Sequence, residues 1–121
     1  MQGRTFKDLE CWKKARELVK EIYQVTRSGS FSKDFGLRDQ IQRSAVSVMA
    51  NIAEGFGTFS DVEFIRFLSI SIRSAYEVQS HLCVALDAGY LQDRELNRLD
   101  YLCNECINLA KGFIRYLKEK I

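Results

Sequence analysis

The sequence predicts an all-α protein, an antiparallel up-down-up-down four-helix bundle, and three observations favour this fold. The 121 residues contain no proline and 46% of them are apolar, so unkinked helices around a core are expected. Apolar residues recur at spacings of three and four in four stretches, which is the helical period. The connections between these stretches are short, and short connections join antiparallel neighbours.

The second stretch is the one around which the rest of the chain is organised. It predicts a helix over residues 32–55, capped by Ser30 or Ser32 and ended by Gly55 and Gly57 in the left-handed conformation. One arc of this helix is apolar: Leu37, Ile41, Ala45, Val48 and Ile52. The neighbouring arc is polar and mostly small: Gln40, Arg43, Ser47, Asn51 and Glu54.

The other three helices are expected over residues 7–27, 60–88 and 93–120, within one domain that spans residues 1–121. Thr5 and Asp8 have the spacing of a helix-start cap, and so do Ser60 and Glu63. The first helix has two apolar seams, which is typical of a bundle helix that also makes oligomer contacts.

Composition and charge exclude several classes of protein. The net charge of +2 does not by itself imply a nucleic-acid partner, and no apolar run approaches the ~20 residues that cross a bilayer. The N-terminus has no apolar core of a signal peptide, so we expect a cytoplasmic protein without a membrane partner. Cys103 and Cys106 form a single C-x-x-C within an apolar row, which favours core packing over a metal or redox site.

Catalytic chemistry is not indicated. His81 is the only histidine and has no orienting partner nearby in the sequence, and no nucleophile–base set is present. We therefore expect no enzyme, no metal site and no cofactor.

The polar arc of the second helix predicts a network with the third. If the two helices form a hairpin, Arg43 should pair with Glu77 and Arg66 with Glu54, with Asn51 beside them. Such a set could be a ligand or catalytic pocket, or it could be a structural network that determines helix register or the oligomer. Compensated charges without a nucleophile favour the structural interpretation.

A second polar set is basic and indicates nucleic-acid binding. The end of the fourth helix should lie beside the start of the first, which predicts one positive surface from Lys13, Lys14, Lys111, Arg115 and Lys118. No row of aromatic residues lies among them, so stacking on single strands is not expected to add much. The alternative is an ordinary solvated helix end, since cations are favoured at helix C-termini and glutamates are interspersed.

Nearly the whole chain resembles the 23S rRNA intervening-sequence protein family, also called the four-helix bundle protein family. The resemblance lies in these phrases: Phe6-x-x-Leu9-x-x-Trp12-x-x-Ala15, Gly36-Leu37-x-x-Gln40-Ile41-x-Arg43-Ser44-Ala45, Asn51-Ile52-Ala53-Glu54-Gly55, Phe64-x-x-Phe67-Leu68 and Ser74-x-x-Glu77. It implies a bacterial four-helix bundle that assembles as a ring-shaped homopentamer. A related branch resembles accessory proteins of diversity-generating retroelements, which implies RNA or DNA and a reverse transcriptase as partners.

Two classes of function follow from the sequence. The first is a non-enzymatic accessory protein that binds nucleic acid or a ribonucleoprotein through an oligomeric basic surface. The second is a protein-binding scaffold ring that has no nucleic-acid partner.

Overall fold

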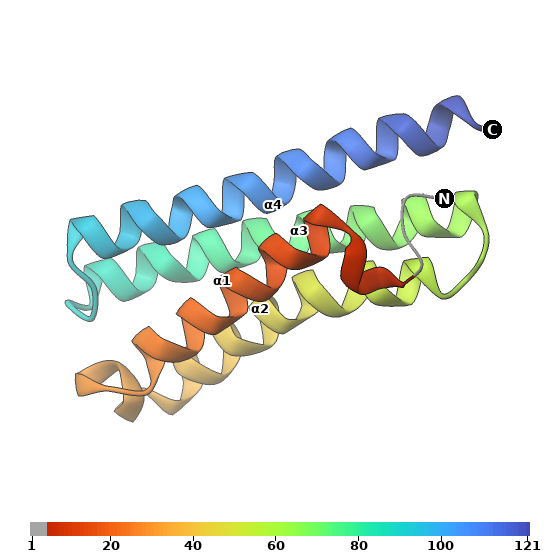
Figure 1. The fold of residues 1–121 in the computed structure, drawn as a ribbon. Helices are drawn as coiled ribbons and strands as arrows, with labels where there is room; N and C mark the ends of the chain where they lie inside the picture. The colour runs from red at the N-terminus through yellow and green to blue at the C-terminus, as the bar shows by residue number, and fades with distance from the viewer. Residues whose placement is uncertain (1–4) are drawn as a thin grey trace.

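A computed structural model describes residues 5–121 of the chain. Within this range four long helices follow one another: α1 (Glu10–Thr26), α2 (Phe35–Phe56), α3 (Asp61–Asp87) and α4 (Asp93–Glu119). Two short 3-10 helices, η1 (Phe6–Asp8) and η2 (Gly29–Lys33), precede α1 and α2. Figure 1 shows the four long helices side by side, each running opposite to the one before it.

The four helices pack as a bundle in which each helix contacts two others, which confirms the predicted fold class. α1 contacts α2 and α4, and α3 contacts α2 and α4, so the α1–α2 seam and the α3–α4 seam lie on opposite sides of the bundle. Each helix contributes an apolar stripe to the shared core. Its fully buried large side chains come from all four helices and η2: Phe31, Leu18, Ile22, Ile41, Ile52, Leu68, Leu82, Leu99, Leu102, Leu117, Val48 and Val78. Burying each contributes on the order of 1.5–3 kcal/mol.

α4 begins at Asp93, as predicted, whereas the predicted caps of the other three helices agree in one case and differ in two. Ser60 caps α3, because its side chain accepts a hydrogen bond from the Glu63 amide at 3.2 Å. The Thr5–Asp8 capping box forms, but it caps η1, and α1 begins only at Glu10. Asp34, rather than Ser30 or Ser32, caps α2, because the two serines lie within η2.

The glycines at the α2–α3 turn act differently from the prediction. Gly57 has a right-handed φ of −72°, and Gly55 lies inside α2. The left-handed residue of this turn is Phe59, with a φ of +55°. Gly55 is required for space instead, because a Cβ there would lie 2.6 Å from Cδ1 of Phe64 and 2.9 Å from Cβ of Phe67. The predicted left-handed glycine end of α2 is therefore wrong.

The opposite end of the bundle is closed by contacts around η2. Phe31 is buried and stacks on Tyr90, with ring centroids 5.1 Å apart. The Tyr90 hydroxyl donates to Asp34 Oδ2 at 2.9 Å, which raises the pKa of Tyr90. The cap of α2 is thus joined to the α3–α4 turn.

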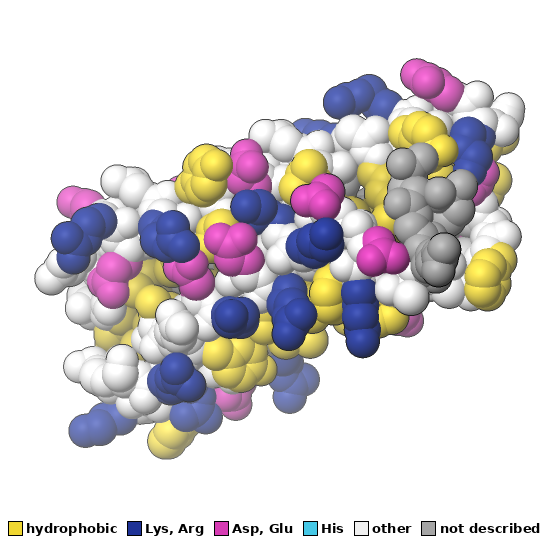
Figure 2. Space-filling model, viewed as in Figure 1, with side chains coloured by type: hydrophobic (Ala, Val, Ile, Leu, Met, Phe, Trp, Pro, Cys, Tyr) yellow, Lys and Arg dark blue, Asp and Glu magenta, His cyan; other side chains and the backbone are white. Residues whose placement is uncertain are grey.

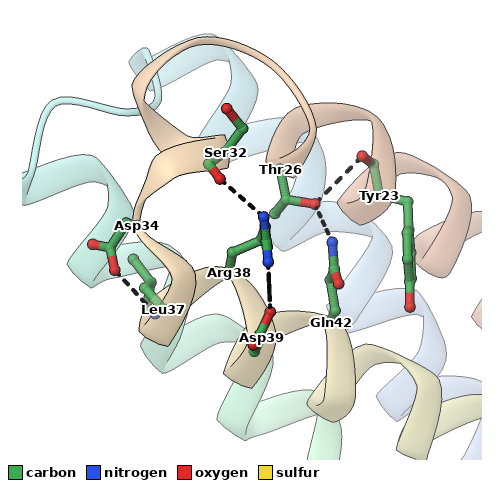
Figure 3. A network of polar contacts seen from close by, with 8 residues as sticks. All are labelled: Tyr23, Thr26, Ser32, Asp34, Leu37, Arg38, Asp39 and Gln42. Carbon is green, nitrogen blue, oxygen red and sulfur yellow. Dashed lines mark hydrogen bonds and ion pairs between the residues drawn. The ribbon is translucent and has the colours of Figure 1, made fainter.

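Polar contacts also tie α1 to α2 at this end (Figure 3). The Thr26 hydroxyl donates to the Ile22 carbonyl at 2.7 Å and accepts from Gln42 Nε2 at 2.9 Å. Arg38 donates to the Ser32 carbonyl at 3.0 Å and pairs with Asp39 at 3.2 Å. The Thr26–Gln42 contact thus joins α1 to α2, and the Arg38–Ser32 contact joins η2 to α2.

None of the described helices has both the length and the apolarity needed to cross a membrane.

Candidate nucleic-acid interface

The polar arc of α2 meets α3 through small neutral side chains. The hydroxyls of Ser47 and Ser74 share a hydrogen bond at 2.8 Å, and the Ser71 hydroxyl donates to the Val48 carbonyl at 2.7 Å. Asn51 donates to the carbonyl and hydroxyl of Ser47 at 2.9 and 3.0 Å. Small side chains let two helices approach closely, and the hydroxyls of Ser47, Ser71 and Ser74 all have partners here. This part of the predicted network therefore joins α2 to α3.

The charged residues of the predicted network do not join α2 to α3, and the two predicted ion pairs, Arg43–Glu77 and Arg66–Glu54, are wrong. Arg66 pairs with Glu63, one turn away on the same helix, at 3.0 Å. Glu77 Oε2 lies 3.5 Å from His81 Nε2, also one turn away. A residue three or four positions away on the same helix is a nearer partner than a residue on the neighbouring helix, because the Cβ atoms of the two residues are close together.

Arg43 and Glu54 are exposed on α2. Among residues 5–121 neither of them forms an ion pair. Arg43 lines an open groove between α1 and α2, on the side of the bundle away from the α3–α4 seam. The arrangement offers no buried charge from these residues to hold a ligand.

Three of the four thiols, those of Cys11, Cys103 and Cys106, are buried in the core, whereas Cys83 is exposed. Burial raises the pKa of Cys11 to about 11 and that of Cys106 to about 12, and it raises the pKa of Cys103 as well. A thiol held neutral at physiological pH is a poor nucleophile and a poor ligand. No group of three or more His, Cys, Asp or Glu residues is arranged to hold a metal ion in the described part of the chain. The prediction that Cys103 and Cys106 pack in the core is confirmed by their burial.

Lys13 and Lys14 are paired with glutamates of their own helix, α1. Lys13 Nζ lies 3.3 Å from Glu10, and Lys14 Nζ lies 3.4 Å from Glu17. A glutamate three residues from each lysine is the sequence signal that predicts these pairs. Figure 2 shows basic and acidic side chains interleaved over the face that carries α1, rather than one positive field.

The structure also separates these lysines from the end of α4. Leu109, Phe113 and Tyr116 line a cavity with Asp8 and Cys11, so this arc of α4 faces the start of α1. Each of these three α4 residues is followed two positions later by a cation: Lys111, Arg115 and Lys118. Two residues correspond to a rotation of about 200° around a helix with 3.6 residues per turn, so the cations lie on the opposite side of α4. The expected joint surface of Lys13 and Lys14 with the three α4 cations is therefore not formed within one subunit.

Lys111, Arg115 and Lys118 form a row of their own, called here the α4 cationic row. The three share one arc of α4 at spacings of four and three, and all are exposed. Among residues 5–121 none of them forms an ion pair. Asn104 begins the same arc seven residues earlier and accepts a hydrogen bond from Gln79 of α3 at 2.9 Å. The row therefore borders the α3–α4 seam.

Other acids and bases balance one another along the α1–α4 seam. Arg98 at the start of α4 binds both carboxylate oxygens of Glu21 and lies 3.9 Å from Glu17. These contacts raise the pKa of the Arg98 guanidinium. They confirm that α1 and α4 run antiparallel, because the start of α4 lies beside the end of α1.

These features define a class: a small helical bundle whose outer faces, rather than an internal pocket, carry its polar chemistry. The family model of the 23S rRNA-intervening sequence protein matches residues 7–112. The chain belongs to this family. Among solved structures, a protein of unknown function from the S23 ribosomal protein family of Bacteroides thetaiotaomicron VPI-5482 has the same fold, with a TM-score of 0.80 and 24% identity. The match covers 87% of this chain and 95% of that one. Among curated proteins no sequence matches significantly.

Proposed function

We propose that the protein is a non-enzymatic accessory protein that binds the phosphate backbone of RNA or DNA through the α4 cationic row. The observation that carries the proposal is the exposure of three cations on one arc of α4, none of which forms an ion pair within residues 5–121. Backbone contacts of this kind position a nucleic acid without reading its sequence. Membership of a family named for an rRNA intervening sequence supports the same partner.

The test is a binding titration at several salt concentrations. Replacing Lys111, Arg115 and Lys118 together with glutamine should flatten the dependence of affinity on salt, by roughly one unit of log–log slope for each phosphate that the variant no longer neutralises. The matched control replaces Lys13 and Lys14, which are already paired with Glu10 and Glu17. That control should change the slope less. Equal slopes for wild type and the α4 variant would move the binding surface elsewhere on the bundle, and no wild-type binding at low salt would contradict the proposal.

The second part of the proposal is that the protein works as a homo-oligomer in the cytoplasm, with five subunits implied by the family resemblance. It is supported by Phe59, whose side chain is 92% exposed in the single chain, and by the nearby Val62, which is 61% exposed. Large exposed apolar side chains usually mark an interface. A ring would repeat the α4 cationic row around its axis and multiply its positive field.

We predict that light scattering will return a multiple of the 14.0 kDa chain mass at micromolar concentration. The physical reason is the removal of Phe59 and its apolar neighbours from water. A monomer under these conditions would contradict the oligomer.

The exposed Phe59 also favours a second candidate function, a protein-binding scaffold without a nucleic-acid partner. A reverse transcriptase or another protein would then occupy the surface around the α2–α3 turn. The two functions are distinguished by the same titration, since a scaffold has no salt-dependent affinity for RNA or DNA.

A further inference from the structure

An exposed tyrosine of α3, Tyr76, lies near the α4 cationic row, whereas Phe113 and Tyr116 of α4 lie on a different arc of that helix from the row. Gln79 Nε2 donates to Asn104 Oδ1 at 2.9 Å, which sets the register of α3 against α4. Tyr76 lies one turn before Gln79 on the same face of α3. Because the helices are antiparallel, Tyr76 is level with the part of α4 between Asn104 and Lys111. Tyr76 is 50% exposed.

A cation, Arg73, and a carboxylate, Glu77, neighbour Tyr76 along α3. Arg73 lies one turn before Tyr76, is exposed, and forms no ion pair among residues 5–121. Glu77, the nearest carboxylate along α3, lies 3.5 Å from His81. In the register set by Gln79 and Asn104, Arg73 of α3 and Lys111, the first cation of the α4 row, are level with each other, and both lie about one turn from Tyr76.

We propose that Tyr76 stacks on an unpaired base of single-stranded RNA or DNA whose phosphates lie along Arg73 and the α4 cationic row. The proposal rests on the proposed function and adds the form of nucleic acid that the site prefers. An aromatic ring beside phosphate-binding cations is the arrangement that holds single strands, since every base has a face that can stack. In a duplex the base faces are already covered by their neighbours, so only the phosphate contacts remain.

The experiment measures fluorescence anisotropy of labelled single-stranded and duplex oligonucleotides of equal length, as RNA and as DNA, with the full chain. Tyr76→Ala should weaken single-strand binding by roughly 5- to 100-fold, the loss expected from one stacked base, and leave duplex binding unchanged. Tyr76→Phe should keep single-strand binding, because stacking needs the ring and not the hydroxyl. The matched control is Tyr23→Ala, since Tyr23 is 41% exposed and lies in the groove between α1 and α2, across the bundle.

The outcomes separate this proposal from the proposed function. If the wild type binds and Tyr76→Ala leaves binding unchanged, the stacking proposal is overturned and the phosphate contacts stand. The same holds if Tyr76→Ala weakens single-strand and duplex binding equally. An equal single-strand loss in Tyr23→Ala would also overturn it. No binding of either form by the wild type would overturn both proposals. Unchanged nucleic-acid binding together with a loss of the oligomer in Tyr76→Ala would assign this face to protein contacts instead.

Discussion

Gly55→Ala is expected to lower the free energy of unfolding by about 1–2 kcal/mol, although alanine is the better helix former. The added Cβ would lie 2.9 Å from Cβ of Phe67 and 2.6 Å from the ring of Phe64. The Phe67 Cβ is attached to the backbone and cannot swing aside, so α3 itself must move away from α2. Overpacking of this kind costs about 1–3 kcal/mol and occasionally more. It outweighs the ~1 kcal/mol that alanine gains over glycine within a helix.

Urea unfolding monitored by circular dichroism measures the effect, and Gly112→Ala is the matched control. Gly112 is also helical, but a Cβ there meets nothing nearer than Arg115 Nη2 at 3.7 Å. The control should therefore gain up to ~1 kcal/mol from helix propensity alone. Equal effects of the two substitutions would mean that α2 and α3 are not in close contact at Gly55.

The second large effect is a loss of stability at alkaline pH that comes from the buried thiols. Burial raises the pKa of Cys11 from 9.0 to about 11 and that of Cys106 to about 12, and Cys103 shifts in the same direction. Below pH 9 these thiols are protonated in both the folded and the unfolded chain, so they give no pH dependence. Above pH 9 the unfolded chain releases their protons while the folded chain retains them. Stability must then fall as the pH rises, until the folded pKa values are passed.

The expected slope is about 1.4 kcal/mol per pH unit for each thiol that stays protonated only in the folded state. Urea unfolding under reducing conditions at pH 7.5, 9 and 10.5 measures it. Cys106→Ala should be less stable than wild type at pH 7.5 but should lose less on going to pH 10.5. A variant that keeps the full wild-type slope would show that Cys106 does not stay protonated in the core.

The fold could be predicted because the apolar period, the composition and the capping residues all favour helices. The apolar arc from Leu37 to Ile52 has the helical period, proline is absent, and Ser60 supplies a cap before α3. The starts of α1 and α2 were harder to predict. Thr5 and the serines before Asp34 belong to 3-10 turns, whose capping residues are the same types that cap an α-helix. The role of Gly55 could not be predicted, since close approach depends on Phe64 and Phe67 from another helix.

The candidate site was predicted less well, and the reason is the choice of partner. A carboxylate on the same helix is always within reach at three or four residues, whereas a partner across a seam depends on rotations that the sequence does not give. Arg66 therefore pairs with Glu63, and Lys13 and Lys14 pair with Glu10 and Glu17. The three α4 cations could be predicted from their spacing alone. Their position next to α3 and Tyr76 required the Gln79–Asn104 contact.

The central claim, that nucleic acid lies along the α4 cationic row, is tested most directly by lysine acetylation in the presence and absence of RNA. Lys111 and Lys118 should be protected from the reagent when RNA is bound at low salt, and the protection should disappear as salt is added. Lys13 and Lys14 should acetylate equally in both cases, because they lie on another side of the bundle and are paired with glutamates. Protection of Lys13 and Lys14 with unchanged reaction at Lys111 and Lys118 would contradict the account.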